Sequence, residues 1–355
     1  MASSSSSQGG LVELASPSLQ PQIKTPLISY LGPAGHLYSR FSQWRTSIGL
    51  PNPGTVEGLQ KEVKNTLLTN FFFDGARADL NKALSMNPAF QVTHSFHLAS
   101  QTSMPSYNFG AVFANASLFL QGGVDHDGNL NARINQGWSP NNVTKIQASI
   151  SGDPQHEGFQ MEHDYQGQDY SVNAKMLNPS PIDLSGVFIG SYLQSITKNL
   201  AVGMETVYQR MQNQSGINTS ALIKYTSTER NWIATTQLQP SGILQSTYWQ
   251  KLSDKVDFAA DFQAVIKPQM RDAIASLGVK YDLRMSTVRA QVDSTGKVSA
   301  LLEQRFAPTF AFLVSGEIDH FRNSAKVGVG VIIETSTLTP EEMGMPSQPY
   351  PPPYP

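Results

Sequence analysis

The sequence has no cysteine and few charges. None of its 355 residues is a cysteine, so disulfide frameworks, thiolate metal sites and cysteine nucleophiles are excluded. Charged residues make up 15% of the chain, whereas an average soluble domain carries about 25%. The formal net charge is −2, and a nucleic-acid partner would require clustered Lys and Arg. The composition therefore predicts no nucleic-acid partner.

Long apolar runs are also missing. No segment approaches the roughly 18 continuous apolar residues of a transmembrane helix. The start, Met1-Ala2 followed by Ser3 to Ser7, lacks the basic and apolar segments of a secretory signal. Small polar residues are abundant where charged and apolar residues are few. This composition is typical of a sheet with one apolar face and one water-exposed face. If this sheet is a membrane barrel, we expect it in the outer membrane of an organelle.

Motifs of catalysis are absent from the sequence. The seven histidines form no His-Glu-x-x-His pattern, and there is neither a Gly-x-Ser-x-Gly elbow nor a phosphate-binding Walker A loop. The sequence therefore predicts a protein that is not an enzyme and that needs no cofactor or metal.

The two ends of the chain differ in composition from the middle. Residues 1–35 are rich in Ser, Pro, Gly and Gln, so we expect residues 1–50 to form a disordered extension. Within it, Leu37, Phe41, Trp44 and Ile48 have the spacing of one face of a short amphipathic helix. Residues 336–355 form a tail rich in proline, for which an extended polyproline conformation is expected.

A second helix is predicted within residues 51–74. Pro51 and Pro53 interrupt the chain, and Thr55 can cap the helix that follows. One stripe of this helix is apolar, which favours packing against a core over a membrane anchor. In a barrel that core would be the inner wall. The stripe consists of Val56, Leu59, Val63 and Leu67.

From about residue 75 to residue 335, apolar and polar residues alternate with a period of two. About nineteen such segments recur every ten to fourteen residues, as a transmembrane strand and a short turn require. An open sheet of that width would leave long edges and an uncovered apolar face, whereas a closed barrel in a bilayer leaves neither. We therefore predict an all-β transmembrane barrel over residues 75–335. A soluble pair of β-sandwiches or a propeller is the alternative.

Several motifs occur along the chain in a recognisable order. They begin at Asn52-Pro53-Gly54-Thr55, Ala78-Asp79-Leu80, Phe90-Gln91-Val92-Thr93-His94, Gly316-Glu317-Ile318 and Lys326-Val327-Gly328. Several of these motifs are five or more residues long, and together they resemble the channel subunit of the mitochondrial outer-membrane protein translocase (the TOM complex), in particular its fungal members, over about residues 51–335. The resemblance implies the eukaryotic porin superfamily, a nineteen-stranded barrel whose first and last strands pair in parallel, and an amino-terminal helix inside the pore.

The last predicted strand carries a further pattern. Lys326, Gly328, Val331 and Ile333 match the polar-x-Gly-x-x-apolar-x-apolar signal by which barrels of this family are sorted into the organelle membrane. An ordinary last strand is the alternative reading of so short a pattern.

The alternation places most charges on the wet face. Acidic residues outnumber basic ones there, and a charge on the lipid face would cost about 2–4 kcal/mol for Arg or Lys near the midplane. Mitochondrial targeting helices are rich in Arg, so a net negative lumen would attract them. Plain solvation of the wall is the alternative for any single residue. The predicted presequence-guiding residues are Asp125, Asp127, Asp293, Glu317 and Asp319.

Two polar residues share the apolar face instead. Lys82 alternates in step with Leu80 and Leu84, so the three side chains share one face of the strand. His94 shares a face with Val92 in the same way. Either they lie at the headgroup level of the bilayer, or they form a subunit or lipid interface at the seam of the first and last strands. The resemblance favours the interface, because the family's channel dimerises near this edge with a receptor subunit and a phospholipid.

The function that the resemblance implies is a protein-conducting channel of the mitochondrial outer membrane. Its partners would be unfolded precursor proteins, the receptor and small subunits of the TOM complex, a second copy of the chain and a phospholipid. A metabolite porin resembling the voltage-dependent anion channel is the alternative, and a soluble all-β binding protein is a more distant one.

Overall fold

A computed structural model describes most of the barrel region. The helix expected within residues 36–48 is described at Arg40, Gln43, Arg45, Ser47 and Ile48, and these residues are helical. The stretch up to Gly49 is a unit separate from the one that begins at Leu50. The rest of the predicted extension and the polyproline tail lie outside the described residues, which are 40, 43, 45, 47–100, 104–152, 157–180, 185–211, 214–267 and 270–336.

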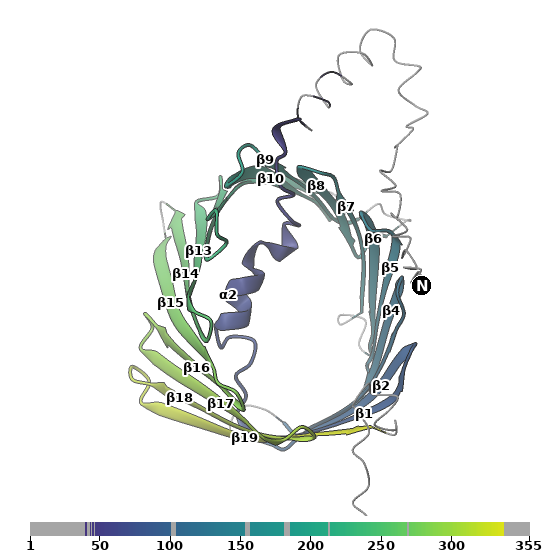
Figure 1. The fold of residues 1–355 in the computed structure, drawn as a ribbon, viewed down its shortest axis with the longest axis vertical. Helices are drawn as coiled ribbons and strands as arrows, with labels where there is room; N and C mark the ends of the chain where they lie inside the picture. Colours follow the sequence, from purple (N-terminus) through teal and green to yellow (C-terminus); the bar gives the residue numbers. More distant parts are fainter. Residues whose placement is uncertain are drawn as a thin grey trace, which may run out of the picture. The chain divides into compact units, whose positions relative to one another are not determined.

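Nineteen strands form one closed sheet, which confirms the predicted fold class (Figure 1). The alternating sequence explains why, because each strand can present one apolar and one polar face. The strands are β1 (Gly75–Met86), β2 (Ala89–His97), β3 (Ser106–Ala114), β4 (Leu118–Asp125), β5 (Leu130–Ser139), β6 (Asn142–Ile150), β7 (Gly158–Gln166), β8 (Tyr170–Leu177), β9 (Gly186–Ser195), β10 (Leu200–Met211), β11 (Gln214–Thr226), β12 (Trp232–Gln239), β13 (Ile243–Ser253), β14 (Val256–Lys267), β15 (Met270–Asp282), β16 (Ser286–Asp293), β17 (Lys297–Ala307), β18 (Phe310–Asp319) and β19 (Ser324–Ser336).

Closure of the barrel joins its first and last strands in parallel. Every strand pairs antiparallel with its sequence neighbour, and β1 pairs parallel with β19 from Gly75↔Gly328 to Ala83↔Ser336. An odd number of strands in an up-and-down meander makes this parallel pair unavoidable. We call the pair the seam.

The strand directions define two mouths. Even-numbered strands all run one way, so they end at the mouth where β1 begins, which we call mouth A. Odd-numbered strands end at the opposite mouth, mouth B. Figure 1 looks into the ring of strands.

The outer face of the barrel is apolar. Exposed side chains such as Phe109, Ile223, Leu277 and Val329 point outward in every part of the wall. Aromatic pairs lie near both mouths, for example Tyr225 with Trp232, whose ring centroids are 5.0 Å apart. An apolar band flanked by aromatic girdles is the outer surface of a barrel in a bilayer. Among the described residues, no helix is both long and apolar enough to cross a membrane.

The segment from residue 51 to residue 74 runs inside the barrel, as the sequence predicted. It contains a short 3-10 helix, η2 (Glu57–Gln60), continued by α2 (Lys61–Thr66). Thr55 accepts the backbone N–H of Gly58 at its hydroxyl oxygen, 3.2 Å away, so the predicted cap is present. The segment starts at mouth B and reaches β1 at mouth A, where Gly75 turns the chain with a φ of 79°. We call it the inner segment.

The predicted stripe faces the inner wall and holds the inner segment in place. Leu59 packs with Leu193 and Leu222, and Val63 and Leu67 pack with Ala259. Near its end, the segment buries Leu68 and Phe73 against Leu301 and Leu313. Burial of one such side chain stabilises the arrangement by about 1.5–3 kcal/mol.

Candidate functional site: the lumen and the seam

The strand register brings the five predicted guiding residues to one mouth. Asp125, Asp293 and Asp319 are the last residues of β4, β16 and β18, so they lie at mouth A. Asp127 follows in the turn after β4, and Glu317 lies two residues before the end of β18. The pairs Asn108↔Asp125, Ser276↔Asp293 and Ser299↔Glu317 put these acids on the same face as polar lumen residues.

The turn after β4 is an acidic loop that contains a histidine. His126 Nδ1 lies 2.7 Å from Asp125 Oδ1, and its Nε2 lies 3.4 Å from Asp127 Oδ1. One ligand-type atom from each of the three side chains thus lies within 4.8 Å of the others. The hydrogen bond with Asp125, followed by the charge of Asp127, raises the pKa of His126 above its usual 6.5. The net charge of this turn therefore depends on pH.

The acids of β16 and β18 have different surroundings. Asp293 accepts the side-chain amide of Gln291 at 2.8 Å. Asp319 is only 5% exposed and accepts the backbone N–H groups of Phe321 and Arg322 at 3.0 and 2.9 Å. Asp319 therefore stabilises the turn between β18 and β19.

Two lysines lie beside the acids of β18. In the register of the sheet, Asp319 lies opposite Lys297 and Glu317 lies opposite Lys326. These two acids thus face cations, whereas Asp125 faces Asn108. Asp293 faces Ser276 on β15, and Lys297 begins the strand that follows its turn. The alternation of side chains along the strands assigned these four acids to the lumen, but it does not show which of them lie beside a cation.

A charged cluster on the wall ties down the start of the inner segment. Lys145 Nζ lies 2.7 Å from Glu57 Oε2, 3.2 Å from Glu162 Oε1 and 2.8 Å from Asp164 Oδ2. Glu162 and Asp164 are buried, and both accept the side-chain amide of Asn173. Lys145 offsets one of these three carboxylates, and Lys175 lies opposite Glu162 in the register, so the cluster keeps a net negative charge on the lumen wall near mouth B.

Wall groups also hold the residues before Glu57 by their main chain. Lys224 Nζ donates to the carbonyl of Pro53 at 2.8 Å, and Ser171 Oγ donates to that of Gly54 at 2.6 Å. Ser195 Oγ donates to the carbonyl of Pro51 at 2.7 Å. The inner segment is thus fixed by polar contacts at mouth B. Beyond this mouth it is held by apolar packing together with buried hydrogen bonds, such as that from the Leu68 N–H to Gln291 Oε1 at 2.7 Å.

The wall from β2 to β6 carries a hollow lined mostly by small or polar residues, together with Phe109 and Val112. Its volume is about 490 Å³, and its lining includes Thr93, Asn108, Gly123, Asn131 and Arg133. The apolar clusters of the inner segment involve other strands, namely β9 to β11, β13, β14 and β17 to β19. The polar side chains of this wall can offer hydrogen bonds to a passing chain.

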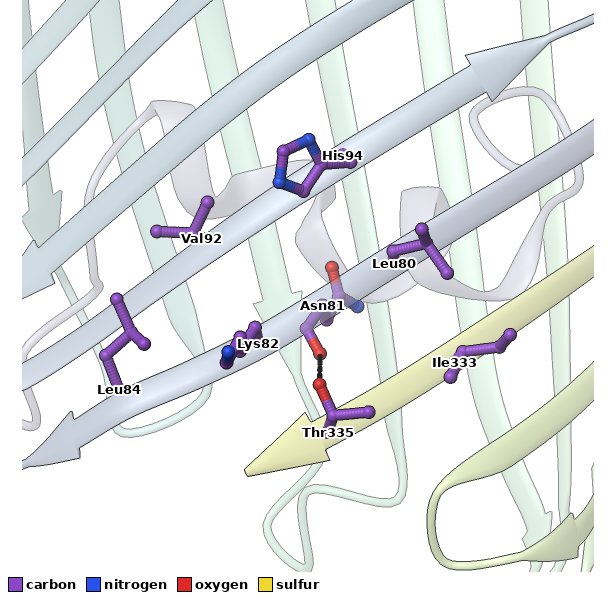
Figure 2. A pocket seen from close by; sticks show the side chains of 8 residues that line it. All are labelled: Leu80, Asn81, Lys82, Leu84, Val92, His94, Ile333 and Thr335. Carbon is purple, nitrogen blue, oxygen red and sulfur yellow. Dashed lines mark hydrogen bonds between the residues drawn. The ribbon is translucent and has the colours of Figure 1, made fainter. Parts of the chain in front are cut away.

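On the outer face, the seam carries a groove that joins the two predicted interface residues (Figure 2). Lys82 and His94 line it together, as their shared parity predicted. His94 lies 2.8 Å, through Nδ1, from the hydroxyl of Tyr107. The groove has a volume of about 380 Å³, and its other lining residues are Leu80, Asn81, Leu84, Val92, Ile333 and Thr335.

The residues of the predicted insertion signal all lie on β19, with two on each face. Lys326 pairs with Glu317 and, like Gly328, faces the lumen. Val331 and Ile333 share the outward parity of exposed Val329. The reading of the sequence did not foresee that Gly328 and Gly330 lie against Phe73. The run Phe71-Phe72-Phe73 just before β1 was the available signal.

A closed barrel with an apolar outer band, a wet lumen and a helix inside it is a membrane channel in architecture. The model of the eukaryotic porin family matches residues 52–328. The mitochondrial import receptor subunit TOM40 of Saccharomyces cerevisiae is 42% identical over 320 residues, which cover 84% of this chain and 82% of that protein. The corresponding Neurospora crassa protein is 38% identical, covering 86% of this chain and 89% of its own. The human homolog is 32% identical, with coverages of 80% and 79%.

The chain therefore belongs to the eukaryotic porin family and, within it, to the TOM40 proteins of fungal type. It is an integral β-barrel of the mitochondrial outer membrane and a channel component of protein transport.

Proposed function

We propose that the barrel conducts unfolded precursor proteins across the mitochondrial outer membrane and guides their cationic presequences along acidic residues at mouth A. The observation that carries the proposal is the convergence of Asp125, Asp127, Asp293, Glu317 and Asp319 on one mouth, although they come from three separate hairpins. Clustered carboxylates raise the local concentration of a cationic segment and speed its arrival. The TOM40 names of the relatives support an import channel for this chain.

Within this set we assign the guidance mainly to Asp125, Asp127 and Asp293. Asp125 faces the uncharged Asn108 in the register, Asp293 faces the uncharged Ser276 on β15, and the side chain of Asp127 is 66% exposed. Glu317 faces Lys326, and Asp319 is used by its own turn. Weak contacts spread over three positions also let a chain leave the site, as conduction requires.

The seam groove is proposed as the interface with other membrane components. Lys82 offers a cation beside an apolar floor, which suits a phospholipid with an anionic headgroup and an acyl chain. A second copy of the chain and the receptor and small subunits of the TOM complex are the proposed protein partners on this outer side. No nucleic-acid partner and no cofactor are proposed.

Two further assignments stay proposals. Lys326, Gly328, Val331 and Ile333 are proposed as the membrane-insertion signal, supported by their position on the last strand.

Residues 51–74 are proposed as the inner helix unit, between an extension of residues 1–50 and the barrel of residues 75–335. Residues 336–355 are proposed as a separate Pro-rich tail.

The proposal is tested by reconstituting the full chain in a planar bilayer and adding an Arg-rich presequence peptide that lacks histidine. We expect a cation-preferring channel and a voltage-dependent block by the peptide. Asp125→Asn, Asp127→Asn and Asp293→Asn should each slow the onset of block several-fold. Glu229→Gln is the matched control, because Glu229 is an exposed acid in the β11–β12 turn at mouth B.

An anion-preferring channel that ignores the peptide would instead favour the metabolite porin. The eukaryotic porin fold is common to both functions, so fold alone does not separate them. If block begins at the same rate in all three variants and in the control, the proposed guidance is wrong, although the channel function is not contradicted.

A further inference from the structure

The end of the inner segment contacts both strands of the seam. Phe73 is 9% exposed and packs with Leu301 and Leu313. Its ring lies against β19, where Cδ2 comes within 2.9 Å of the position that a Cβ on Gly328 would take. The guanidinium of Arg77, on β1, lies 6.0 Å from the centroid of the same ring. One aromatic side chain thus joins the first and the last strand of the barrel from inside.

Two glycines on β19 form the space for this residue. A Cβ on Gly328 would overlap the carbonyl oxygen of Phe73 and the hydroxyl of Ser315, well inside van der Waals contact. A Cβ on Gly330 would lie 3.0 Å from Phe73 Cζ. Ser315 also donates a hydrogen bond to the carbonyl of Phe73. Backbone and ring of Phe73 are therefore both held in a slot that side chains on these two positions would fill.

The seam needs such support more than other strand pairs do. A parallel ladder is slightly less stable per residue than an antiparallel one. Glycine inside a strand weakens the ladder further, and Gly328 and Gly330 pair with Gly75 and Arg77 of β1. The two glycines therefore reduce the stability of the seam where Phe73 restores contact.

We propose that Phe73, seated on Gly328 and Gly330, is a clamp that keeps the β1–β19 seam closed from the lumen side. Phe73 has a structural role, because its ring packs against β17, β18 and β19 and also lies beside Arg77 of β1. Arg77 is itself oriented by Asp79, whose Oδ2 lies 2.6 Å from its Nε. Gly328 thereby gains a role in the finished barrel that is independent of any part it plays in sorting. The seam reaches its final packing only once the inner segment lies in the lumen.

The test is hydrogen exchange of the full chain in lipid nanodiscs, read by mass spectrometry. In Phe73→Ala, amides of β1 and β19 should exchange at least tenfold faster, while the β9–β10 pair keeps its rate. Leu59→Ala is the matched control, because it removes another buried anchor of the inner segment that packs on Leu193 and Leu222, far from the seam. Unchanged exchange at the seam in Phe73→Ala, or an equal rise in Leu59→Ala, would overturn the clamp.

A milder set of variants keeps the test decisive if Phe73→Ala does not fold. Gly330→Ala adds a methyl group against the ring tip and should speed exchange at the seam. In a Phe73→Leu background, which lacks Cζ, the same methyl group should have little further effect. If the two changes act additively, Phe73 and Gly330 do not form one slot and the proposal fails.

Discussion

At the scale of single residues, His126 is a side chain in direct contact with two of the proposed guiding acids, and its charge changes near neutral pH. Its raised pKa means that the folded turn favours the protonated ring. The stability from that pairing is fully present below the unfolded pKa of about 6.5 and is lost as pH rises through the folded value. The protonated ring also offsets one of the two neighbouring carboxylates.

We therefore expect the block by a presequence peptide to begin faster as pH rises from about 6 to 8. Deprotonation of His126 leaves Asp125 and Asp127 as an uncompensated pair, which attracts cations more strongly. Single-channel recording with a peptide that has no histidine measures the rate. His126→Gln should show a flat profile at the faster level. A wild-type rate that falls or stays constant over this range would contradict the argument.

Lys145 is the residue on which the wall cluster depends. Replacing it with Met removes the cation that contacts both buried Glu162 and buried Asp164, a loss that costs about 3–5 kcal/mol for a buried pair. Glu57→Gln should have a small effect on thermal unfolding in detergent, because the Glu57 side chain is 57% exposed. Combining Lys145→Met with Glu162→Gln and Asp164→Asn should recover most of the stability. A Lys145→Met variant no less stable than Glu57→Gln would show that the cluster is not coupled.

The outward groove yields a prediction at Lys82. Lys82→Glu should reduce the binding of anionic phospholipid several-fold, as read by native mass spectrometry of the purified protein. Lys198→Glu is the control, because Lys198 is an exposed lysine in the β9–β10 turn at the same mouth. If both variants lose lipid equally, the groove has no special role in lipid binding.

At the scale of elements, α2 is held by its fit against one position of the wall. A Cβ on Gly278 would lie 2.6 Å from Leu67 Cδ2, so a larger side chain there displaces the inner segment. Gly278→Val should destabilise the seated segment by about 1–3 kcal/mol, the usual cost of overpacking. Faster hydrogen exchange over residues 57–68 would report it. Gly110→Val is the control on the other wall, where the nearest atom to a Cβ is 3.9 Å away.

The elements themselves were predictable because each has a clear period. Alternation located the strands, and the stripe from Val56 to Leu67 indicated a helix with one buried face. The partners of that face were not predictable, because parity assigns Ala259 or Leu193 to the lumen without saying which part of the wall the segment crosses. The same limit applies to Lys145, whose three partners come from η2 and β7.

The sequence predicted which face of the barrel the candidate acids share, but it did not predict their different surroundings. Parity placed Asp319 with Asp125, but only the turn geometry shows that Asp319 accepts two backbone N–H groups. Gly328 belonged to a recognisable pattern, yet its contact with Phe73 joins two residues from opposite ends of the barrel sequence. Contacts over such sequence distances follow from closure of the barrel, which no local pattern encodes.

At the scale of the whole molecule, the field at mouth A depends on salt. The Debye length falls from about 10 Å at 0.1 M to about 3 Å at 1 M ionic strength. The block rate of a cationic peptide should therefore drop steeply over this range, whereas single-channel conductance should rise with the supply of ions. A block rate that does not change with salt would mean that apolar contacts, and not the acids, capture the peptide.

The inner segment also changes how often the chain passes through the membrane. Nineteen strands alone would separate the two ends of the barrel unit, but the segment from mouth B to mouth A adds one more passage, which makes the total even. Residue 50 and residue 336 therefore both meet the barrel at mouth B. A protease or an epitope reporter confined to that compartment should reach both attachment points, and one confined to the other compartment should reach neither.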